Sequence, residues 1–327
     1  MVTRARIVVP RSRYAAFETY ESNDEPLGEH DIAGPTVVSL LSAGTEIALY
    51  RKERAEPFYP GYCCVFRVER VGSAVTDVAP GDYVYAMAPH QSYQRLPRKE
   101  ALKVPAGLAP DIAVFARMAN MAMTAIATTA ARPPQLAFVN GLGLIGQMTA
   151  QVCRLTGYEV AAADASEERR AIARSFGAGA VYDRIPVDDP AVAGRVSLFL
   201  DCSGKEQDVI DGCRTVHPNG EVVLIGVPWT QRSEHTAHEL ISLVFHRYVR
   251  LRSGWEWEIP LHAEREGQPS VMGSKAAALR WLADGRLRVD DLYETVDPRD
   301  AEDVYRRIDR REREKIATVF DWRTFAE

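Results

Sequence analysis

The sequence has few of the features that mark membrane-spanning, secreted or nucleic-acid-binding proteins. Apolar runs such as 198–200 and 222–227 are far shorter than the roughly 20 residues that a membrane-spanning helix needs. Four arginines within the first 13 residues interrupt the chain before any apolar stretch typical of a secretory signal. A net charge of −5 provides no basic face for nucleic acid. These absences predict a cytoplasmic protein with no nucleic-acid or membrane partner.

Cysteine is scarce and forms neither a disulfide pattern nor a metal-binding pattern. The five cysteines are an odd number, which does not suit a paired framework. The sequence has no Cys-x-x-Cys pair and no cysteine–histidine cluster with the spacing of a structural zinc site. The adjacent residues Cys63 and Cys64 are therefore expected to be buried thiols that form no disulfide.

The clearest positive pattern lies in residues 136–164. An apolar run enters the sequence GLGLIG, a helical pattern follows, and a second apolar run ends in an acidic residue. In a strand–turn–helix of this kind, the first glycine, Gly141, permits the tight turn out of the strand. Gly143 leaves room for a pyrophosphate, and Gly146 lets the helix pack closely. The pattern predicts a dinucleotide-binding site.

The residues after the turn bear on how the cofactor is held and which cofactor it is. The helix that begins near Leu144 and Ile145 points unpaired backbone N–H groups at the phosphates. Asp164 lies close to the offset of roughly 20 residues at which an acid accepts hydrogen bonds from the adenosine ribose, which favours NAD over NADP. Arg169 and Arg170 leave open the alternative that a 2′-phosphate is bound instead.

The rest of the chain divides into three parts. Short strands separated by Pro-Gly turns predict a β-barrel-type half for residues 1–110. A long helix at 111–131, followed by alternating strands and helices, predicts a parallel sheet covered on both faces up to residue 252. Residues 253–327 carry two helical patterns and a last strand, and they are expected to return to the N-terminal half.

Several short motifs outside the glycine turn resemble those of the medium-chain dehydrogenase/reductase superfamily. They lie at residues 42–46 (SAGTE), 60–61, 80–82, 201–204 (DCSG) and 223–228 (VLIGVP). The resemblance covers nearly the whole chain and implies an α/β protein with a GroES-like catalytic domain at 1–110. It further implies a Rossmann domain at 111–252, a C-terminal return at 253–327, and a homodimer, which we expect to form along the strand at 248–252 or its neighbour.

The residues at the zinc positions of the superfamily differ in this chain. The Cys-Gly-Thr-Asp segment of the zinc enzymes is matched by Ala43 and the Gly-Thr-Glu that follows it, and the histidine of their Gly-His-Glu motif by Tyr62. A third ligand position corresponds to Arg117. The resemblance therefore implies a zinc-free member. The SAGTE segment and the ending at 320–322 (FDW) place it nearest to the bacteriochlorophyllide a dehydrogenase-like group, whose namesake oxidises a hydroxyethyl group to a ketone.

Without zinc, another group must stabilise charge on the substrate oxygen. The resemblance offers three catalytic candidates: Tyr62 as a phenolic proton donor, Thr45 as a hydroxyl that relays the substrate proton, and Arg117 as a fixed positive charge. The alternatives are that Tyr62 packs under the nicotinamide, that Thr45 caps a helix, and that Arg117 pairs with Glu46.

The resemblance also implies further cofactor contacts. Gly226 and Val227 follow the strand that passes beside the nicotinamide in the superfamily. Lys315 lies near a basic residue that reaches the pyrophosphate there, and a lysine suits a phosphate as a point charge. The alternative is that Lys315 belongs to the solvated run of charges at 310–315.

Trp255, Trp257 and His90 are the candidate substrate-lining residues. An aromatic wall of Trp255 and Trp257 would suit a small or ring-containing substrate, such as a sugar, cyclitol, polyketide or tetrapyrrole-like compound. The alternatives are a domain-interface role for the tryptophans and a surface loop for His90. The predicted function is a zinc-independent, NAD(H)-dependent oxidoreductase that interconverts a secondary alcohol and a ketone. An NAD(P)H-dependent quinone or enone reductase and a non-catalytic dinucleotide-binding protein are the alternatives.

Overall fold

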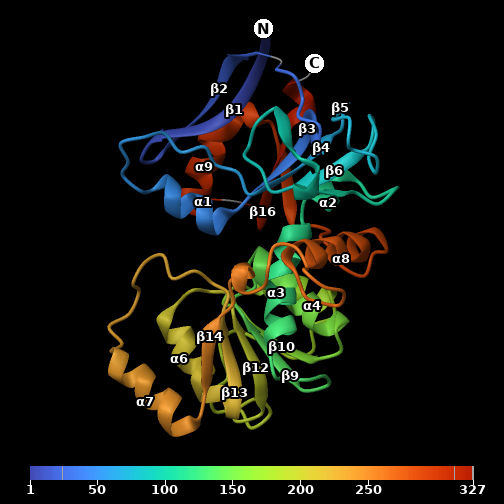
Figure 1. Ribbon diagram of the computed structural model, residues 1–327. Coiled ribbons are helices and arrows are strands. Elements are labelled where there is room, and N and C mark those ends of the chain that lie inside the picture. Colours follow the sequence, from blue (N-terminus) through green and yellow to red (C-terminus); the bar gives the residue numbers. More distant parts are fainter. Residues whose placement is uncertain (24, 313, 326–327) are drawn as a thin grey trace. The chain divides into compact units, whose positions relative to one another are not determined.

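The computed structural model describes residues 1–23, 25–312 and 314–325, and it divides into two compact units. The first, here called the N/C unit, comprises Met1–Phe115 and Val289–Glu327; the second, the central unit, comprises Ala116–Arg288 (Figure 1). Residues 253–288, expected from the sequence to return to the N-terminal half, thus belong to the central unit. In the described part of the chain, no helix is long and apolar enough to cross a membrane.

The central unit is built on a parallel sheet of six strands in the order β11-β10-β9-β12-β13-β14. The strands are β9 (Leu136–Asn140), β10 (Glu159–Ala163), β11 (Val181–Tyr182), β12 (Val196–Asp201), β13 (Val216–Leu224) and β14 (Arg250–Ser253). The strand that comes first in the sequence, β9, lies in the middle, and the chain continues to β10 on one side and to β12 on the other. Such a reversal creates a ligand-binding crevice at the carboxyl ends of the strands.

Helices cover both faces of this sheet, as the sequence pattern predicts. They are α3 (Ala116–Thr128), α4 (Leu144–Leu155), α5 (Glu167–Ser175), α6 (Glu206–Thr215), α7 (Ala237–Arg247) and α8 (Val271–Ala283), with a short turn η2 (Glu256–Glu258). Ala137 and Val139 of β9 pack on the face shared with α3 and α4, whereas Phe138 packs on the face of α6 and α7. The sequence alternates in this way because neighbouring strand side chains point to opposite faces.

Helix α8 explains why the unit boundary falls later than the sequence predicts. Its residues Ala278, Leu279 and Leu282 are buried, and the helix packs on α3. The predicted helix at 111–131 is likewise interrupted. It forms α2 (Pro110–Ala113), then a turn in which Phe115 is buried against Tyr293 of the N/C unit, and only then α3. Both boundaries depend on which partner each apolar face meets in the folded chain.

The N/C unit contains a mixed β-sheet and a β-hairpin. Its strands are β1 (Val2–Arg11), β2 (Tyr14–Ser22), β3 (Asp31–Leu41), β4 (Cys63–Arg67), β5 (Arg70–Val71), β6 (Tyr83–Ala86), β7 (Tyr93–Pro97), β8 (Ala101–Lys103), β15 (Tyr293–Val296) and β16 (Ala317–Asp321). Its helices are α1 (Ala43–Tyr50), α2 and α9 (Ala301–Arg310), with short turns η1 (Arg98–Glu100), η3 (Pro298–Asp300) and η4 (Trp322–Phe325). Strand β16 pairs antiparallel with β3, so the end of the chain completes the N-terminal sheet.

Candidate functional site

The glycine turn after β9 has a separate steric reason for each of its three glycines. Gly141 has φ +85°, and a Cβ atom there would lie 2.9 Å from the backbone nitrogen of Ser203. A Cβ atom on Gly146 would lie only 1.8 Å from the carbonyl oxygen of Gly141. A Cβ atom on Gly143 would meet no atom within 4 Å, so the space beside this residue is open. The turn is tight on the protein side and open on the side where a pyrophosphate would approach.

Helix α4 starts directly at this turn. Gly143 is its N-cap, with extended backbone and no side-chain cap, and Leu144 and Ile145 form the first turn. The first backbone hydrogen bond of the helix runs from Gln147 N–H to the Gly143 carbonyl. The preceding N–H groups therefore lack an intrahelical acceptor, which makes the helix start a binding place for an anion.

Asp164 lies beside the glycine turn, directly after β10. Its Oδ2 atom accepts a hydrogen bond from the backbone N–H of Leu142 at 2.7 Å, and Oδ1 accepts one from Ser166 N–H at 2.8 Å. Arg169 Nη1 lies 3.4 Å from Oδ2, and Arg170 donates to the Asp164 carbonyl. The acid is thus held next to the glycine turn, where an acid that contacts a ribose would lie.

The loops after β12 and β13 contact each other at the same edge of the sheet. The buried carboxylate of Asp201 accepts hydrogen bonds from Ser203 N–H, Ser203 O–H and Gly204 N–H, and burial raises its pKa. A Cβ atom on Gly226 would lie 2.3 Å from Gly204 nitrogen, so the two loops are in backbone contact. Val227 follows with half of its surface exposed. The DCSG motif indicated this loop, but the sequence did not reveal the hydrogen bonds that Asp201 accepts from it.

Arg117 lies in the first turn of α3, within a buried charged cluster. Its guanidinium donates to Glu256 Oε1, with Nε at 3.1 Å, while Asn120 Nδ2 donates to Oε2 at 2.8 Å. The ammonium of Lys275 on α8 lies 3.8 Å from Oε2. The Glu256 and Lys275 side chains are almost completely buried. The predicted fixed charge of Arg117 is therefore matched by a buried carboxylate, and sequence analysis missed Glu256 and Lys275 because they are far from Arg117 along the chain.

In residues 255–258, which comprise η2 and the residue before it, two exposed tryptophans alternate with two acids held by ion pairs. Glu256 is held by the cluster around Arg117, whereas Trp255 and Trp257 are exposed to 65% and 44%. Glu258 Oε2 lies 3.2 Å from Arg252 Nη1. The two acids hold this turn on the central unit and leave both indole rings accessible, but no contact tests their predicted role toward a substrate.

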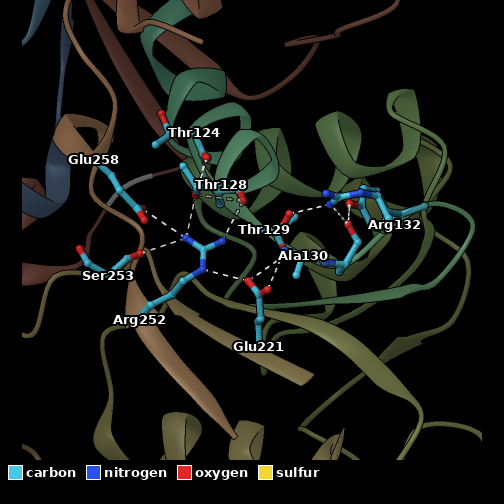
Figure 2. A network of polar contacts seen from close by, with 12 residues as sticks. Thr124, Thr128, Thr129, Ala130, Arg132, Glu221, Arg252, Ser253 and Glu258 are labelled. Carbon is cyan, nitrogen blue, oxygen red and sulfur yellow. Dashed lines mark hydrogen bonds and ion pairs between the residues drawn. The ribbon is translucent and has the colours of Figure 1, made fainter. Parts of the chain in front are cut away.

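Arg252 is the centre of a second polar network, which joins β14 to β13 and to the end of α3 (Figure 2). It pairs with Glu221 at 2.9 Å and donates to Thr128 Oγ1. Glu221 also accepts hydrogen bonds from Thr129 Oγ1 and from Ala130 N–H. Burial alone would raise the pKa of Glu221, but these hydrogen bonds and the charge of Arg252 outweigh it and hold the pKa below the usual value. The network fixes the strand that precedes η2.

Two of the predicted catalytic residues, Thr45 and Tyr62, belong to the N/C unit. Thr45 lies in the first turn of α1, whose N-cap is Ser42, so the alternative that Thr45 is the cap is wrong. Tyr62 directly precedes β4, and both side chains are partly buried. Next to Thr45, Glu46 turns inward, and its Oε1 accepts a hydrogen bond from Ser42 N–H at 2.8 Å.

His90 is not the cleft-lining or surface-loop residue that the sequence suggested. Its side chain has no exposed surface, and both ring nitrogens have partners: Glu46 Oε2 at 3.1 Å from Nε2 and Ser39 Oγ at 2.7 Å from Nδ1. The Tyr305 hydroxyl donates to the same carboxylate oxygen of Glu46. A histidine buried and bonded in this way has no atom left for a substrate, so its position in a Pro-His loop was misleading.

Lys315 lies at a surface hollow of about 490 Å³ in the N/C unit. Two aspartates, Asp290 and Asp291, line the same hollow, and the ammonium lies 3.8 Å from Asp291 Oδ1. The lysine side chain is 39% exposed. Its predicted contact with a pyrophosphate stays a prediction.

The residues that the resemblance aligns with zinc ligands do not form a zinc-binding set. Alanine, tyrosine and arginine occupy the three positions, whereas zinc in proteins is held by cysteine, histidine and carboxylate ligands. Within residues 1–23, 25–312 and 314–325, no group of three or more His, Cys, Asp or Glu side chains could hold a metal ion. The five cysteines are thiols that form no disulfide, and Cys63 and Cys64 are buried.

Comparisons with known proteins agree with this architecture. Residues 145–252 match the family described as zinc-binding dehydrogenase. The chain is 30% identical over 241 residues to L-threonine 3-dehydrogenase of Thermococcus kodakarensis. The aligned region covers 59% of this chain and 68% of that protein.

Solved structures extend the fold match over nearly the whole chain. Galactitol-1-phosphate dehydrogenase of Escherichia coli superposes with a TM-score of 0.79 at 17% identity, over 97% of this chain and 99% of that one. A Sinorhizobium meliloti 1021 protein, described as a zinc-binding dehydrogenase and bound to NADP, gives a TM-score of 0.76 at 18% identity, over 98% and 100%. At such identities, these two structures establish the fold and not the substrate.

Proposed function

The chain belongs to the medium-chain dehydrogenase/reductase superfamily of alcohol dehydrogenase-like oxidoreductases, and from this premise we propose that it is a zinc-independent, NAD(H)-dependent enzyme. The proposed reaction interconverts a secondary alcohol and a ketone on a small or ring-containing substrate. The observation that carries the proposal is the glycine turn after β9, which is open at Gly143 and has Asp164 fixed beside it.

The central unit suits the binding of NAD. The open space at Gly143 and the start of α4 accept a pyrophosphate, and Asp164 accepts hydrogen bonds from the ribose hydroxyls. A carboxylate there also repels a 2′-phosphate. The bonds that Asp164 receives from Leu142 and Ser166 keep it at the turn, which supports NAD over NADP.

The chemistry at the substrate oxygen falls to side chains of this chain. Bound NAD supplies the hydride acceptor, which leaves the hydroxyl proton of the alcohol for the protein to handle. The hydroxyl of Tyr62 or of Thr45 is the proposed proton carrier. Arg117 is the third candidate, as a fixed positive charge near the substrate oxygen. Its charge is paired with that of Glu256. The side chains at the former ligand positions do not fit zinc, which supports a reaction without a metal ion.

The proposal is tested by titrating the purified, metal-analysed protein with NADH and NADPH, using the fluorescence of the reduced nicotinamide. We expect tight NADH binding without zinc and weaker NADPH binding. Asp164→Asn keeps acceptor and donor atoms at the turn but removes the charge, so it should weaken NADH binding about tenfold and narrow the preference over NADPH. Glu168→Gln, an exposed change in the first turn of α5, is the matched control and should bind both cofactors like the wild type.

Each outcome separates the proposed function from its alternatives. Oxidation of a secondary alcohol with NAD, lowered by Tyr62→Phe or Thr45→Ala, supports the proposal. A preference for NADPH with turnover of quinones or enones replaces it with the reductase alternative. Cofactor binding without turnover of any alcohol, ketone, quinone or enone favours a non-catalytic binding protein, and stoichiometric zinc contradicts the metal-free reaction.

We further propose a homodimer formed along β14. This strand is the outermost one beside β13 in the central sheet, so its outer edge can pair with a second copy. Sedimentation at micromolar concentration should give the mass of a dimer. A monomeric mass would contradict the proposal.

A further inference from the structure

A buried polar network in the N/C unit is centred on Glu46 and His90. The Glu46 side chain is 3% exposed and the His90 side chain 0%, so a carboxylate has been taken out of water. Such burial is costly unless hydrogen bonds compensate for it. Glu46 has three donors, which are Ser42 N–H, His90 Nε2 and the Tyr305 hydroxyl. The sequence named His90 and Glu46 for other roles and did not reveal that they contact each other.

The donor and acceptor roles in the network are determined by chemistry. An ionised carboxylate only accepts, so Nε2 of His90 donates to Glu46. The indole N–H of Trp322 donates to Ser39 Oγ at 2.8 Å, and the same oxygen is the partner of Nδ1. Burial and the neighbouring charge of Glu46 raise the pKa of Tyr305 well above its usual value, so this phenol keeps its proton and acts as a donor. The imidazole is therefore held at both nitrogens.

The backbone of His90 contacts the loop that carries Tyr62. His90 N–H donates to the Pro60 carbonyl at 2.8 Å. Gly61 has φ +142°, and a Cβ atom there would lie 2.2 Å from Pro89 Cα and 2.3 Å from His90 nitrogen. The two backbones are in direct contact, so any displacement of His90 must also move residues 60–62.

The side chain and backbone of His90 together connect the two places that carry the proposed proton carriers. Glu46 follows Thr45 in α1, while Pro60 and Gly61 precede Tyr62. We propose that His90 is a positioning residue, which holds the Tyr62 loop at a fixed distance from the first turn of α1. The inference rests on the proposed function for its effect on turnover, whereas its effect on the loop can be measured without any substrate.

The test compares three variants of the full-length protein. His90→Leu removes both side-chain hydrogen bonds, and His90→Gln restores an N–H donor and a second polar atom. Tyr305→Phe is the matched control, because it removes a different hydrogen bond to the same carboxylate, donated from α9. Hydrogen exchange of peptides spanning 60–63, kcat, KM and the melting temperature are measured for each variant.

We expect His90→Leu to speed exchange at 60–63 and to lower kcat by roughly tenfold to a hundredfold, with NADH affinity unchanged, because a small misplacement of a reacting group is costly. His90→Gln should recover most of both losses. Tyr305→Phe should lower the melting temperature while leaving exchange at 60–63 and kcat near wild type. Equal effects of His90→Leu and Tyr305→Phe on exchange and kcat, in proportion to lost stability, would overturn the inference.

One further variant and two combinations of outcomes keep the test decisive. If His90→Leu does not fold, Ser39→Ala removes the partner of Nδ1 together with the acceptor of the Trp322 indole, and unchanged exchange at 60–63 in that variant counts against the inference. If exchange responds as expected but the wild type turns over no substrate, the positioning role stands and the proposed function fails. If turnover is present but neither exchange nor kcat responds to His90→Leu, the positioning role fails and the proposed function stands.

Discussion

Gly143 and Gly146 lie in the same turn, but replacing each by alanine should have a different effect. Gly146→Ala should lower stability, whereas Gly143→Ala should lower the affinity for NADH. At Gly146 the added Cβ would lie 1.8 Å from the Gly141 carbonyl oxygen, so the helix and the turn must separate by roughly 1.5 Å. Forced overpacking of this kind costs about 1–3 kcal/mol. A loss of 2 kcal/mol corresponds to a melting temperature lower by roughly 4–8 °C for a unit of this size.

At Gly143 the added Cβ meets no protein atom within 4 Å, and the backbone, at φ −66°, is acceptable for alanine. Only the weaker N-cap preference of alanine remains, so the change in stability should stay within about 1 kcal/mol. The same methyl group occupies the space left for the pyrophosphate. We therefore expect NADH affinity to fall at least about tenfold, which is 1.4 kcal/mol of binding free energy.

The assay pairs thermal unfolding without cofactor with fluorescence titration of NADH. Gly143→Ala should unfold like the wild type and bind poorly, whereas Gly146→Ala should unfold at a lower temperature. A control needs a glycine at which an added Cβ meets no other atom. Gly194 has such space, but its φ of +70° would strain any side chain, so Gly194→Ala is not suitable. Gly44→Ala is the better control, since that residue has open space and no positive φ, and lies in the N/C unit. Wild-type NADH affinity in Gly143→Ala would refute the assignment of the open space to the pyrophosphate.

Three further predictions concern the network of Figure 2 and the charged cluster of α3. Arg252→Met should destabilise the protein by about 2–3 kcal/mol in chemical denaturation, below the full cost of breaking a buried pair because Arg252 is 19% exposed. Arg174→Met, which breaks an exposed pair, should change stability by less than about 0.5 kcal/mol, and an equal loss in both variants would contradict this reasoning. Because the folded-state pKa of Glu221 is lowered, its stabilising contribution is present at neutral pH and is lost as the pH falls through that lowered pKa. Melting curves of Glu221→Gln should therefore depend less on pH in the acidic range than those of the wild type, and parallel curves would show that Glu221 is not responsible. Glu256→Gln should lower the melting temperature, because it leaves Arg117 and Lys275 facing a neutral amide, and an unchanged melting temperature would show that the cluster adds no stability.

The glycine turn and its surroundings could be derived from the sequence because their determinants are local. The strand, the glycines and the start of α4 are consecutive, and each glycine is required by atoms of the same turn or of a loop that packs on it. Asp164 is farther away, but β10 pairs with β9 in register, so its distance along the chain determines where it lies. Alternating strands and helices likewise led to the parallel sheet.

The boundaries and the partners of charged residues could not be derived in this way. The apolar face of α8 would suit either unit, and only its packing on α3 shows that residues 253–288 belong to the central unit. Strands such as β2 and β7 are mostly half-buried and have mixed polarity, so their periodicity is weak in the sequence.

The sequence by itself determined that this chain folds into a dinucleotide-binding α/β unit joined to a β-rich unit, because those patterns repeat over short distances. Only the tertiary structure decided that His90 is a buried partner of Glu46, and that Glu256 and Lys275 surround Arg117. A histidine, a glutamate or a lysine has the same local preferences whether it faces solvent or a buried counter-charge. Its role depends on which distant segment the fold brings against it, and that information is absent from the residues on either side.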